Sequence, residues 1–362
     1  MSTHILDSRI YREDVSRVGD LDLDWDKFQD ATVVISGASG MIGSFLVDVL
    51  MTRNLAYGMN CTIHALTRDQ ATLAARFQTY AGHANLRLIL ANLTSFPSDP
   101  VLTNFTSGTG PCFVIHGASN THPVAYASDP IGTIITNVQG TRTMLDLAVR
   151  ADARRTVFLS TVEIYGENTG SVERFRESDL GYIDCNTLRA GYPESKRTGE
   201  ALCQAFREQL GHDVVIPRLP RVFGPTMKLT DTKAASQFML KAVANEDIVL
   251  KSDGNQFYSF CYVADAVSAI LTCLFEGRSG EAYNVADTTC DVSLKDLAQM
   301  TATAVERNVV FDTPGDIEQR GFSTATLAVM DGTKLAGLGW APLYSIAEGV
   351  DHTIAVLKEI TH

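Results

Sequence analysis

The feature that most constrains this chain is a glycine-spaced turn lying directly between a short apolar run and a helical pattern. Residues 31–36 read Ala-Thr-Val-Val-Ile-Ser, and Gly37-Ala-Ser-Gly40-Met-Ile-Gly43 follows at once. Gly37 permits a tight turn, Gly40 leaves room where a pyrophosphate would approach the backbone, and Gly43 allows close helix packing. The following helix N-terminus offers free amides and a positive dipole to phosphate. This strand, turn and helix in order predict a dinucleotide-binding site.

Apolar runs and helical patterns keep alternating after this turn. Strands that are apolar on both faces and separated by helices are typical of a parallel sheet covered on both sides. The sequence therefore predicts an α/β fold, a doubly wound parallel sheet of the Rossmann type. The expected strands are 31–36, 61–66, 86–90, 111–116, 156–160 and 214–217, and the expected helices are 41–53, 69–80, 130–151 and 193–210.

The two ends of the chain depart from this alternation. Residues 1–30 are expected to form an N-terminal extension, with a short acidic helix packed on the body by Trp25 and Phe28. The Rossmann domain is expected over 31–215. Residues 216–362 are expected to form mainly a small, discontinuous substrate-binding lobe, because the pocket of such a sheet lies beyond the strand C-termini. Elements expected there, some returning to the sheet, are a strand end and helix over 259–276, a strand over 281–285, and helices over 294–305 and 345–360.

Charge and cysteine usage limit the classes of partner. The formal net charge of -12 argues against a broad nucleic-acid footprint or a polybasic membrane patch. No stretch approaches the roughly 20 apolar residues of a membrane span, and residues 1–30 lack the apolar core of a secretory signal. The 7 cysteines form no C-x-x-C pair and lie mostly in apolar segments, as expected of reduced thiols in a cytoplasmic protein. The 8 histidines show no ligand spacing, so no catalytic metal is expected.

Tyr192 and Lys196 are four residues apart, so both lie on one face of the helix expected there. A phenol with an ordinary pKa near ~10 is a poor base at neutral pH. A nearby ammonium and an oxidised nicotinamide would both favour the phenolate and lower that pKa. The pair could then accept a hydroxyl proton while hydride leaves the same carbon. Tyr192 and Lys196 are therefore the predicted catalytic pair of a nicotinamide-dependent enzyme that oxidises an alcohol.

Two further polar residues follow the expected fifth strand, in Ser160-Thr161-Val162-Glu163. In an extended chain Thr161 and Glu163 point to the same face, which can meet a substrate at the end of a strand. Thr161 would then hydrogen-bond the reacting hydroxyl and Tyr192. Glu163 would act as a second acid or base at a neighbouring carbon. The alternative for Glu163 is a carboxylate paired with a nearby lysine or arginine.

The type of nicotinamide cofactor depends on the end of the second strand, which reads Ala65-Leu-Thr-Arg68-Asp69. An acidic residue at this place binds the adenosine ribose of NAD, whereas Arg68 could face the 2'-phosphate of NADP. Arg68 could equally be a solvent-facing residue at a helix start. Asn92, after the third strand, is placed to hydrogen-bond the adenine edge or to form a turn. NAD is the expected cofactor, and NADP is the alternative.

Several landmarks follow one another in order along the chain. They are the glycine turn, His116-Gly-Ala-Ser119, Asn137-Val-Gln-Gly140-Thr141, residues 160–166, Tyr192-x-x-x-Lys196, residues 218–225, Tyr262-Val-Ala-Asp265, Tyr283-Asn284 and residues 338–342. Together they resemble the extended short-chain dehydrogenase/reductase superfamily, and within it the NAD-dependent epimerase/dehydratase family, from about residue 31 to the end.

This resemblance implies a bound NAD(P), a nucleotide-linked sugar as substrate, and a homodimer built on helices 130–151 and 193–210. The residues it places at the cofactor are Gly37, Ser39, Gly40, Met41, Ile42, Gly43, Arg68, Asn92, Leu93, Ala118, Ser119, Asn137, Ser160, Tyr192 and Lys196. The residues it places at the substrate are Thr121, Arg221, Lys228, Lys233 and Tyr258.

Three stretches are most similar to UDP-glucuronate decarboxylases: residues 118–126, 160–165 and 231–238. The likeness implies oxidation at sugar C4, an event at the adjacent carbon, and reduction by the retained hydride. An electron-withdrawing ketone at C4 makes loss of CO2, loss of water or epimerisation accessible. The resemblance therefore leaves the outcome of the reaction open.

Three positions depart from the family pattern. Val162 stands where sugar-nucleotide 4,6-dehydratases carry an aspartate, which counts against that dehydration. Tyr258 replaces an arginine that many relatives use for the sugar diphosphate, and a tyrosine brings no positive charge. Thr226 follows Gly-Pro where an arginine often stands. The cations that could compensate are Lys228, Lys233 and Arg221.

Two other functions stay open from the sequence. One is a net reductase of a sugar or small molecule that uses external NADPH, which Arg68 would suit. The other is a non-catalytic sensor that binds the dinucleotide without turnover. The combination of Tyr192, Lys196 and Thr161 argues against the sensor.

Overall fold

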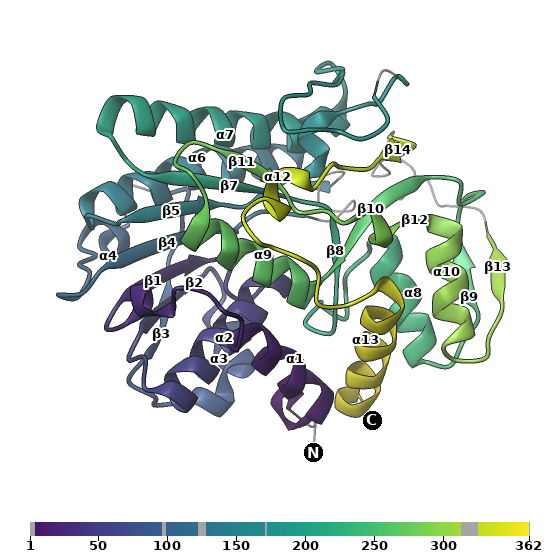
Figure 1. Ribbon diagram of the computed structural model, residues 1–362, viewed down its shortest axis with the longest axis horizontal. Coiled ribbons are helices and arrows are strands. Elements are labelled where there is room, and N and C mark those ends of the chain that lie inside the picture. Colours follow the sequence, from purple (N-terminus) through teal and green to yellow (C-terminus); the bar gives the residue numbers. More distant parts are fainter. Residues whose placement is uncertain (1–3, 96–98, 122–127, 171, 313–324, 362) are drawn as a thin grey trace.

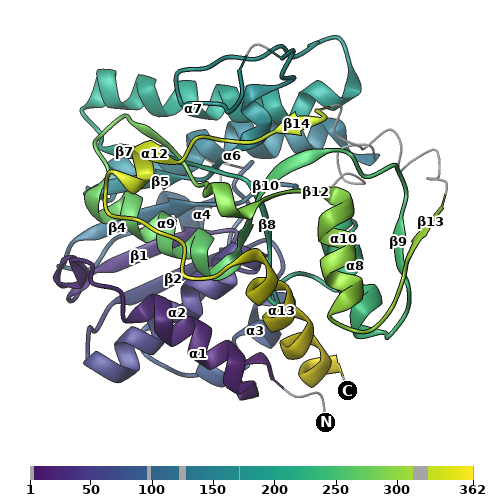
Figure 2. The same ribbon diagram turned by 45° about the vertical axis from the view of Figure 1, so that its right-hand side comes forward.

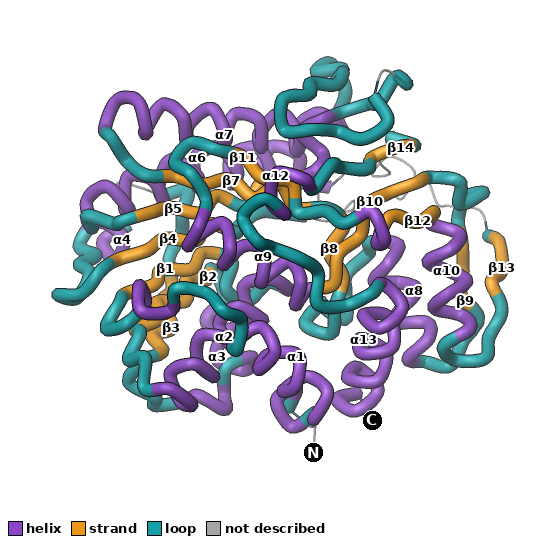
Figure 3. Tube along the Cα trace, viewed as in Figure 1, coloured by secondary structure: helices purple, strands orange, loops and turns teal. Residues whose placement is uncertain are grey.

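The computed structural model describes residues 4–95, 99–121, 128–170, 172–312 and 325–361. Within these residues the main layer is an 8-stranded sheet whose pairs are all parallel (Figure 1). Helices cover both of its faces (Figure 3). The predicted doubly wound parallel sheet is confirmed. Its strands are β1 (Thr32–Ser36), β2 (Thr62–Thr67), β3 (Leu86–Leu90), β4 (Cys112–His116), β5 (Arg155–Phe158), β6 (Ser160–Thr161), β7 (Val214–Leu219) and β11 (Ala282–Asn284).

The strand order of the sheet, β11-β7-β5-β4-β1-β2-β3, reverses direction between β1 and β4. The chain builds outward from β1 to β3 on one side and then from β4 to β11 on the other. In open sheets of this kind, ligands bind outside the carboxyl ends of the strands where the order reverses. Because β1 ends at Ser36 and β4 at His116, the glycine turn begins at this point.

A pair of long helices packs on each face of the sheet. On one face α6 (Pro130–Arg150) packs against α7 (Gly191–Leu210), and on the other α2 (Met41–Tyr57) packs against α9 (Val263–Glu276) (Figure 2). The helix expected over 69–80 is shorter, because α3 (Gln70–Arg76) ends before a separate 3-10 turn at Gln78–Tyr80. A short helix, α4 (Pro100–Thr103), precedes β4.

A smaller body lies beyond the carboxyl ends of the main strands (Figure 1). One of its sheets pairs β10 (Phe257–Tyr262) with β8 (Arg221–Phe223), β12 (Asp291–Ser293) and β14 (Leu327–Ala328). A second sheet pairs β9 (Ile248–Leu250) with β13 (Val309–Phe311). The helices of this body are α8 (Ala234–Val243), α10 (Leu294–Thr303) and α13 (Ile346–Thr361), and the short α12 (Thr333–Ala336) contacts β11. The expected elements over 259–276 and 281–285 correspond to β10 with α9 and to β11.

The N-terminal extension is held on the body by aromatic contacts and one buried carboxylate. The rings of Trp25 and Phe28 pack against Phe275 of the body, as the sequence predicted. The helix of this extension, α1 (Arg9–Gly19), has three arginines against two carboxylates, so the expectation of an acidic helix is wrong; the acidic residues 20–26 follow α1 and lie outside it. Asp14 of α1 is buried and accepts a 2.6 Å hydrogen bond from the Tyr262 hydroxyl. It also meets Nδ1 of His352 on α13 at 2.9 Å. Asp14 thus joins the first helix to β10 and to the last helix.

This contact predicts that His352→Gln destabilises the protein more at pH 5.5 than at pH 8.5. The hydrogen bond to Asp14 raises the pKa of His352 above its usual value, so the folded state binds the imidazole proton more tightly than the unfolded state. The resulting stabilisation is complete below the unfolded pKa and is lost as the pH rises through the folded pKa. Gln keeps a neutral donor but no charge. Melting curves of wild type and variant at both pH values check this, with His83→Gln as control. An equal loss at both pH values would contradict it.

The described residues contain neither a disulfide nor a helix that could span a membrane. All 7 cysteines are described and none is in a disulfide; Cys185 is exposed and the other six are buried. Buried thiols of this kind pack as small apolar side chains. No described helix is both long and apolar enough to cross a membrane.

Candidate active site

A cavity of about 830 Å³ opens at the carboxyl ends of the main strands, between the large sheet and the smaller body. Its walls come from the segments that follow β1, β2, β3, β4, β5 and β7, from one face of α7, and from β8, α8, β9 and β10. Among the described residues that line it, eight are Lys or Arg and three are Asp or Glu. The cavity is therefore basic in a chain whose formal net charge is -12, which favours an anionic ligand.

The glycine turn forms one end of this cavity, and its backbone is packed too tightly for side chains. Gly37 has a φ of 74°, and a Cβ there would lie 2.8 Å from the backbone nitrogen of Ala118. A Cβ on Gly43 would lie 2.9 Å from Cα of Ala38 and closer still to the Gly37 carbonyl oxygen. Helix α2 begins after Gly40 without a side-chain cap, so its first amides face the cavity. This arrangement suits a phosphate.

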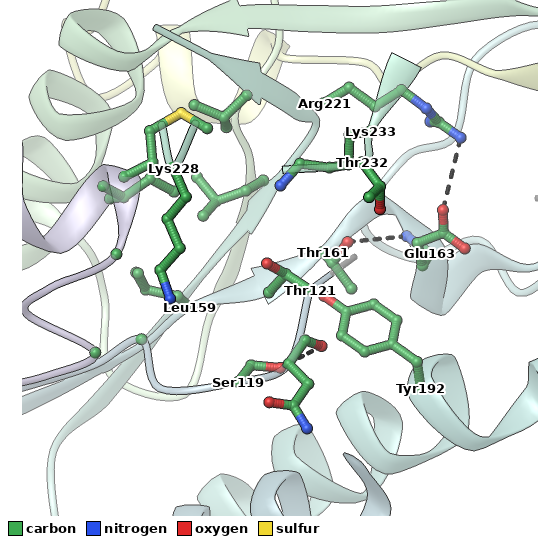
Figure 4. Close-up of a pocket in the computed structure, with 18 of the residues that line it drawn as sticks. Ser119, Thr121, Leu159, Thr161, Glu163, Tyr192, Arg221, Lys228, Thr232 and Lys233 are labelled. Carbon is green, nitrogen blue, oxygen red and sulfur yellow. Dashed lines mark hydrogen bonds and ion pairs between the residues drawn. The ribbon is translucent and has the colours of Figure 1, made fainter. Parts of the chain in front are cut away.

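Tyr192 and Thr161 meet near the middle of the cavity (Figure 4). Tyr192 is 7% exposed, and burial raises the pKa of its phenol to about 12, with a further rise from the Glu163 carboxylate. A hydrogen bond with Thr161 and the charge of Arg189 act in the opposite direction. Burial therefore outweighs the effect of Arg189 and Thr161 in the protein alone, and a lowering of this pKa by the Lys196 ammonium together with an oxidised nicotinamide stays a prediction.

Lys196 lines the same cavity one helical turn after Tyr192. Its ammonium donates a 2.8 Å hydrogen bond to the carbonyl oxygen of Leu159 and lies 4.8 Å from the ring centroid of Phe158. Burial lowers the pKa of Lys196 to about 8, and the carboxylate of Glu200 partly opposes this. The ammonium of Lys196 therefore lies next to the end of β5, and its hydrogen bond is to the backbone.

Glu163 reaches the cavity by a different route from the one predicted. The extended chain ends at Thr161, and a 3-10 turn (Val162–Tyr165) follows, capped by the Thr161 hydroxyl, which accepts from the Glu163 amide at 3.3 Å. The side chain of Glu163 then forms ion pairs with Arg189 at 2.7 Å and with Arg221 at 3.6 Å. The alternative that the sequence left open, a carboxylate paired with arginine, describes its contacts.

Asn137 lies behind the cavity wall rather than in it. Its carbonyl oxygen accepts a 2.6 Å hydrogen bond from the hydroxyl of Ser119, which does line the cavity. Its amide group donates to the hydroxyl of Ser195 at 2.8 Å, and that hydroxyl donates to the backbone carbonyl of Tyr192 at 2.8 Å. Asn137 therefore ties the segment after β4 to the helix that carries Tyr192, and its predicted place at the cofactor is an indirect one.

The cavity end beyond β2 and β3 carries Arg68, Asp69 and Asn92. Arg68 is exposed, and Asp69 caps α3 by accepting from the Thr72 amide at 3.1 Å. The hydrogen bonds from Thr72 lower the pKa of Asp69, and the charge of Lys228 contributes to this. Asn92 forms a turn in which its side-chain oxygen accepts from the Thr94 amide at 3.1 Å, which confirms the turn. Asn92 also lines the cavity, and its hydrogen bond to the adenine edge stays a prediction.

The residues predicted to meet the substrate all line the cavity but enter it from different sides. Lys228 approaches from the side away from Glu163, and Thr121 lies near Thr161 (Figure 4). Lys233 is paired with Asp231 at 2.8 Å. Tyr258 is buried and donates a 2.8 Å hydrogen bond to the carbonyl oxygen of Ala325. Residues 122–126 of the stretch 118–126 lie outside the described residues.

Most other predicted cofactor residues also line the cavity, namely Ser39, Met41, Ile42, Leu93, Ala118 and Ser160. The hydroxyl of Ser160 donates to Glu200 at 2.5 Å. Arg189 is the main residue that the sequence reading missed. It lies three residues before Tyr192, in the 3-10 turn Leu188–Ala190 that leads into α7, so its spacing from Tyr192 was the available signal.

The fold and the site together define a class of protein. A doubly wound sheet, a glycine turn at its reversal point, and a Tyr-x-x-x-Lys pair facing that turn are the features of the extended short-chain dehydrogenases/reductases. Comparison with known proteins narrows the class. The chain belongs to the NAD dependent epimerase/dehydratase family, whose model matches residues 33–286.

Individual relatives extend this finding. The chain is 30% identical over 322 residues to UDP-glucuronic acid decarboxylase 3 of Arabidopsis thaliana, covering 88% of this chain and 86% of that one. It is 27% identical to UDP-glucuronic acid decarboxylase 1 of Xenopus tropicalis, covering 91% and 73%. Among solved structures, the UDP-glucuronic acid 4-epimerase of Bacillus cereus, bound to UDP-glucuronic acid and NAD, has a TM-score of 0.74 at 19% identity, covering 91% of this chain and 99% of that one. This last likeness shows the shared fold.

Proposed function

We propose that this protein is an enzyme that holds NAD and modifies a nucleotide-linked sugar through transient oxidation at C4. The observation that carries the proposal is the shared cavity: Tyr192, Lys196 and Thr161 face the same space as the glycine turn. Its family membership and the decarboxylase relatives support the same reaction type. Residues 31–215 would act as the cofactor-binding domain, and residues 216–362 mainly as the substrate lobe.

The residues present fit a dinucleotide. The uncapped start of α2 and the side-chain-free Gly40 suit the pyrophosphate, and Ser119 and Leu93 line the cavity wall between the two ends. Arg68, Asp69 and Asn92 would hold the adenosine end. NAD, when bound, supplies the acceptor and donor for the hydride at C4.

The protein's own residues would handle the proton. Tyr192 would take the proton of the C4 hydroxyl and return it, while Thr161 holds that hydroxyl by a hydrogen bond. Lys196, fixed by the carbonyl of Leu159, brings a positive charge to the cavity floor and so offsets the charge of the phenolate. Glu163 would act on the carbon next to C4, because its carboxylate lies near Tyr192 and is held by two arginines.

A C4 ketone permits several net reactions, and the UDP-glucuronic acid decarboxylases among the relatives of this chain favour one of them. Their names state a UDP-linked acidic sugar and loss of CO2. Val162 counts against 4,6-dehydration, since the acid used there by dehydratases is missing. We therefore propose decarboxylation or epimerisation of an activated sugar as the net reaction.

A second candidate is a net reductase that consumes NADPH, which the position of Arg68 on the cavity wall favours. One experiment separates the two candidates. The purified protein is analysed for bound cofactor and then incubated with UDP-glucuronate, UDP-glucose, UDP-galacturonate and dTDP-glucose. The proposed function predicts retained NAD, no net change at 340 nm, and a product that has lost CO2 or changed configuration. Net oxidation of added NADPH would support the reductase instead, and binding without any turnover would support a sensor.

We also propose a cytoplasmic location, which the free cysteines support.

We further propose a homodimer built on α6 and α7. On α6 the side chains of Ile131, Ile134 and Ile135 are exposed, which is unusual for a helix of a monomer. Wild type should sediment as a dimer, and Ile135→Glu should shift it toward monomer because the charge would be buried at the interface. Thr198→Glu on α7 provides a second test of the same face. A monomeric wild type would contradict the proposal.

A further inference from the structure

Arg221 enters the cavity from β8 and points at the carboxylate of Glu163 (Figure 4). Arg189 pairs with the other oxygen of the same carboxylate. Two guanidinium groups therefore share one carboxylate, which leaves a net positive charge beside Tyr192. The side chains are only 15% exposed for Arg189 and 22% for Arg221, so water screens this charge poorly.

Arg221 also keeps unused hydrogen-bonding capacity. Its Nη1 is buried and has no hydrogen-bond partner among the described residues. A buried guanidinium nitrogen without a partner is costly, and an anion with two oxygens satisfies it best because its geometry matches the planar fork. The site is thus prepared for a second carboxylate.

Tyr258 holds the guanidinium of Arg221 in place. Cζ of Arg221 lies 3.4 Å from the centroid of the Tyr258 ring, and the ring is anchored by its hydrogen bond to Ala325. An arginine at position 258 would repel Arg221, whereas an aromatic ring attracts a cation over its face. Tyr258, which departs from the family pattern, therefore positions the guanidinium of Arg221 by a cation–π contact.

The position of Arg221 relates it to the sugar ring rather than to the diphosphate. Glu163 is close enough for its charge to act on Tyr192, and Arg221 is paired with Glu163. Lys228 lies on the far side of Tyr192 from this pair (Figure 4). If Tyr192 faces C4, Glu163 and Arg221 lie beside a carbon next to C4, and in a hexuronate the substituent of one such carbon, C5, is a carboxylate.

We propose that Arg221 binds the C5 carboxylate of a nucleotide-linked hexuronate, so that the enzyme selects acidic over neutral sugars. The inference rests on the proposed function, since it assumes that C4 faces Tyr192. The substrate carboxylate and Glu163 together balance the two arginines, which a neutral hydroxymethyl group cannot do. Arg221 is thus a specificity-determining residue that works from β8, paired with the ring at position 258.

The test compares binding of UDP-glucuronate, UDP-glucose and UDP to wild type and to Arg221→Gln by calorimetry, with NAD content measured alongside. Wild type should prefer UDP-glucuronate to UDP-glucose. Arg221→Gln should weaken UDP-glucuronate by at least about 30-fold, because it removes one member of a poorly hydrated charge pair, and should change UDP and UDP-glucose by less than about 3-fold. Arg221→Lys keeps the charge without the planar fork and should fall between the two, provided that its melting temperature shows a folded protein.

Lys241→Gln is the matched control, because Lys241 also lines the cavity but is paired with Glu246. This variant should leave the preference for the uronate unchanged. If wild type binds UDP-glucose as tightly as UDP-glucuronate, or if Arg221→Gln weakens all three ligands equally, the carboxylate assignment is overturned while the proposed function stands. Failure of all three ligands to bind wild type would overturn the proposed function together with this inference.

Discussion

Replacing Tyr192 with phenylalanine is expected to lower kcat by about 10²- to 10⁴-fold, the range typical for loss of a general acid–base group. The ring sits in a buried site that phenylalanine fills equally well, so packing is kept and only the phenolic oxygen is lost. The Tyr192 phenol hydrogen-bonds Thr161, so it is well placed to take the proton of a hydroxyl held by Thr161. Turnover is measured by chromatography and mass spectrometry of the sugar nucleotides, and bound NAD by its release from denatured protein.

The Tyr192→Phe result is informative only if the cofactor stays bound. We expect NAD content and melting temperature close to those of wild type, because the glycine turn is not touched. Tyr182→Phe, at a position with 60% exposure, controls for the chemical change itself and should be fully active. Normal turnover by Tyr192→Phe would show that the proton is taken elsewhere and would refute the assigned chemistry.

Replacing Gly43 with alanine is expected to weaken NAD binding by about 10- to 100-fold, corresponding to an overpacking cost of about 1–3 kcal/mol. The added Cβ would collide with the carbonyl oxygen of Gly37 and with Cα of Ala38, both of which are backbone. The turn must therefore shift, and with it the amides at the start of α2. Affinity is measured by titrating NAD into protein from which the cofactor has been removed.

Gly19→Ala is the matched control for this substitution. Gly19 is also helical, but a Cβ there would meet only the flexible side chain of Arg53, at 3.6 Å. Alanine is favoured over glycine by about 1 kcal/mol in a helix interior and by less at Gly19, the last residue of α1, so this variant should be about as stable as wild type, with unchanged NAD affinity. If Gly43→Ala bound NAD as tightly as wild type, the glycine turn would not be the site of the cofactor.

The residues that were predicted well are those whose role follows from local sequence. The strand at 32–36, its turn and α2 occur in direct succession, and their order is enough to predict them. Tyr192 and Lys196 are one helical turn apart, so their common face follows from helix geometry alone. In the smaller body, α10 and α13 correspond to helices that the sequence predicted, whereas β8, β9, β12, β13 and β14 were missed because they have two or three residues each, too few for a periodic pattern.

Other features depended on contacts between distant segments. Glu163 meets Arg189 from a turn before α7 and Arg221 from β8, and nothing in the local sequence of Glu163 points to either. Asn137 supports Ser119 and Ser195 from behind the wall, although its motif suggested a direct place at the cofactor. The raised pKa of Tyr192 follows from its burial, which the helix spacing of Tyr192 and Lys196 could not reveal.

The sequence by itself determined the class of fold, and it was enough to predict the glycine turn and the Tyr192–Lys196 pair, because each depends on residues that are neighbours along the chain or on a helix. Only the tertiary structure decided which charges surround Glu163, where Arg221 rests, and how strongly the phenol of Tyr192 holds its proton. Electrostatic energies vary with distance and with exposure to water, and both quantities are set when β8, α7 and the end of β6 come together.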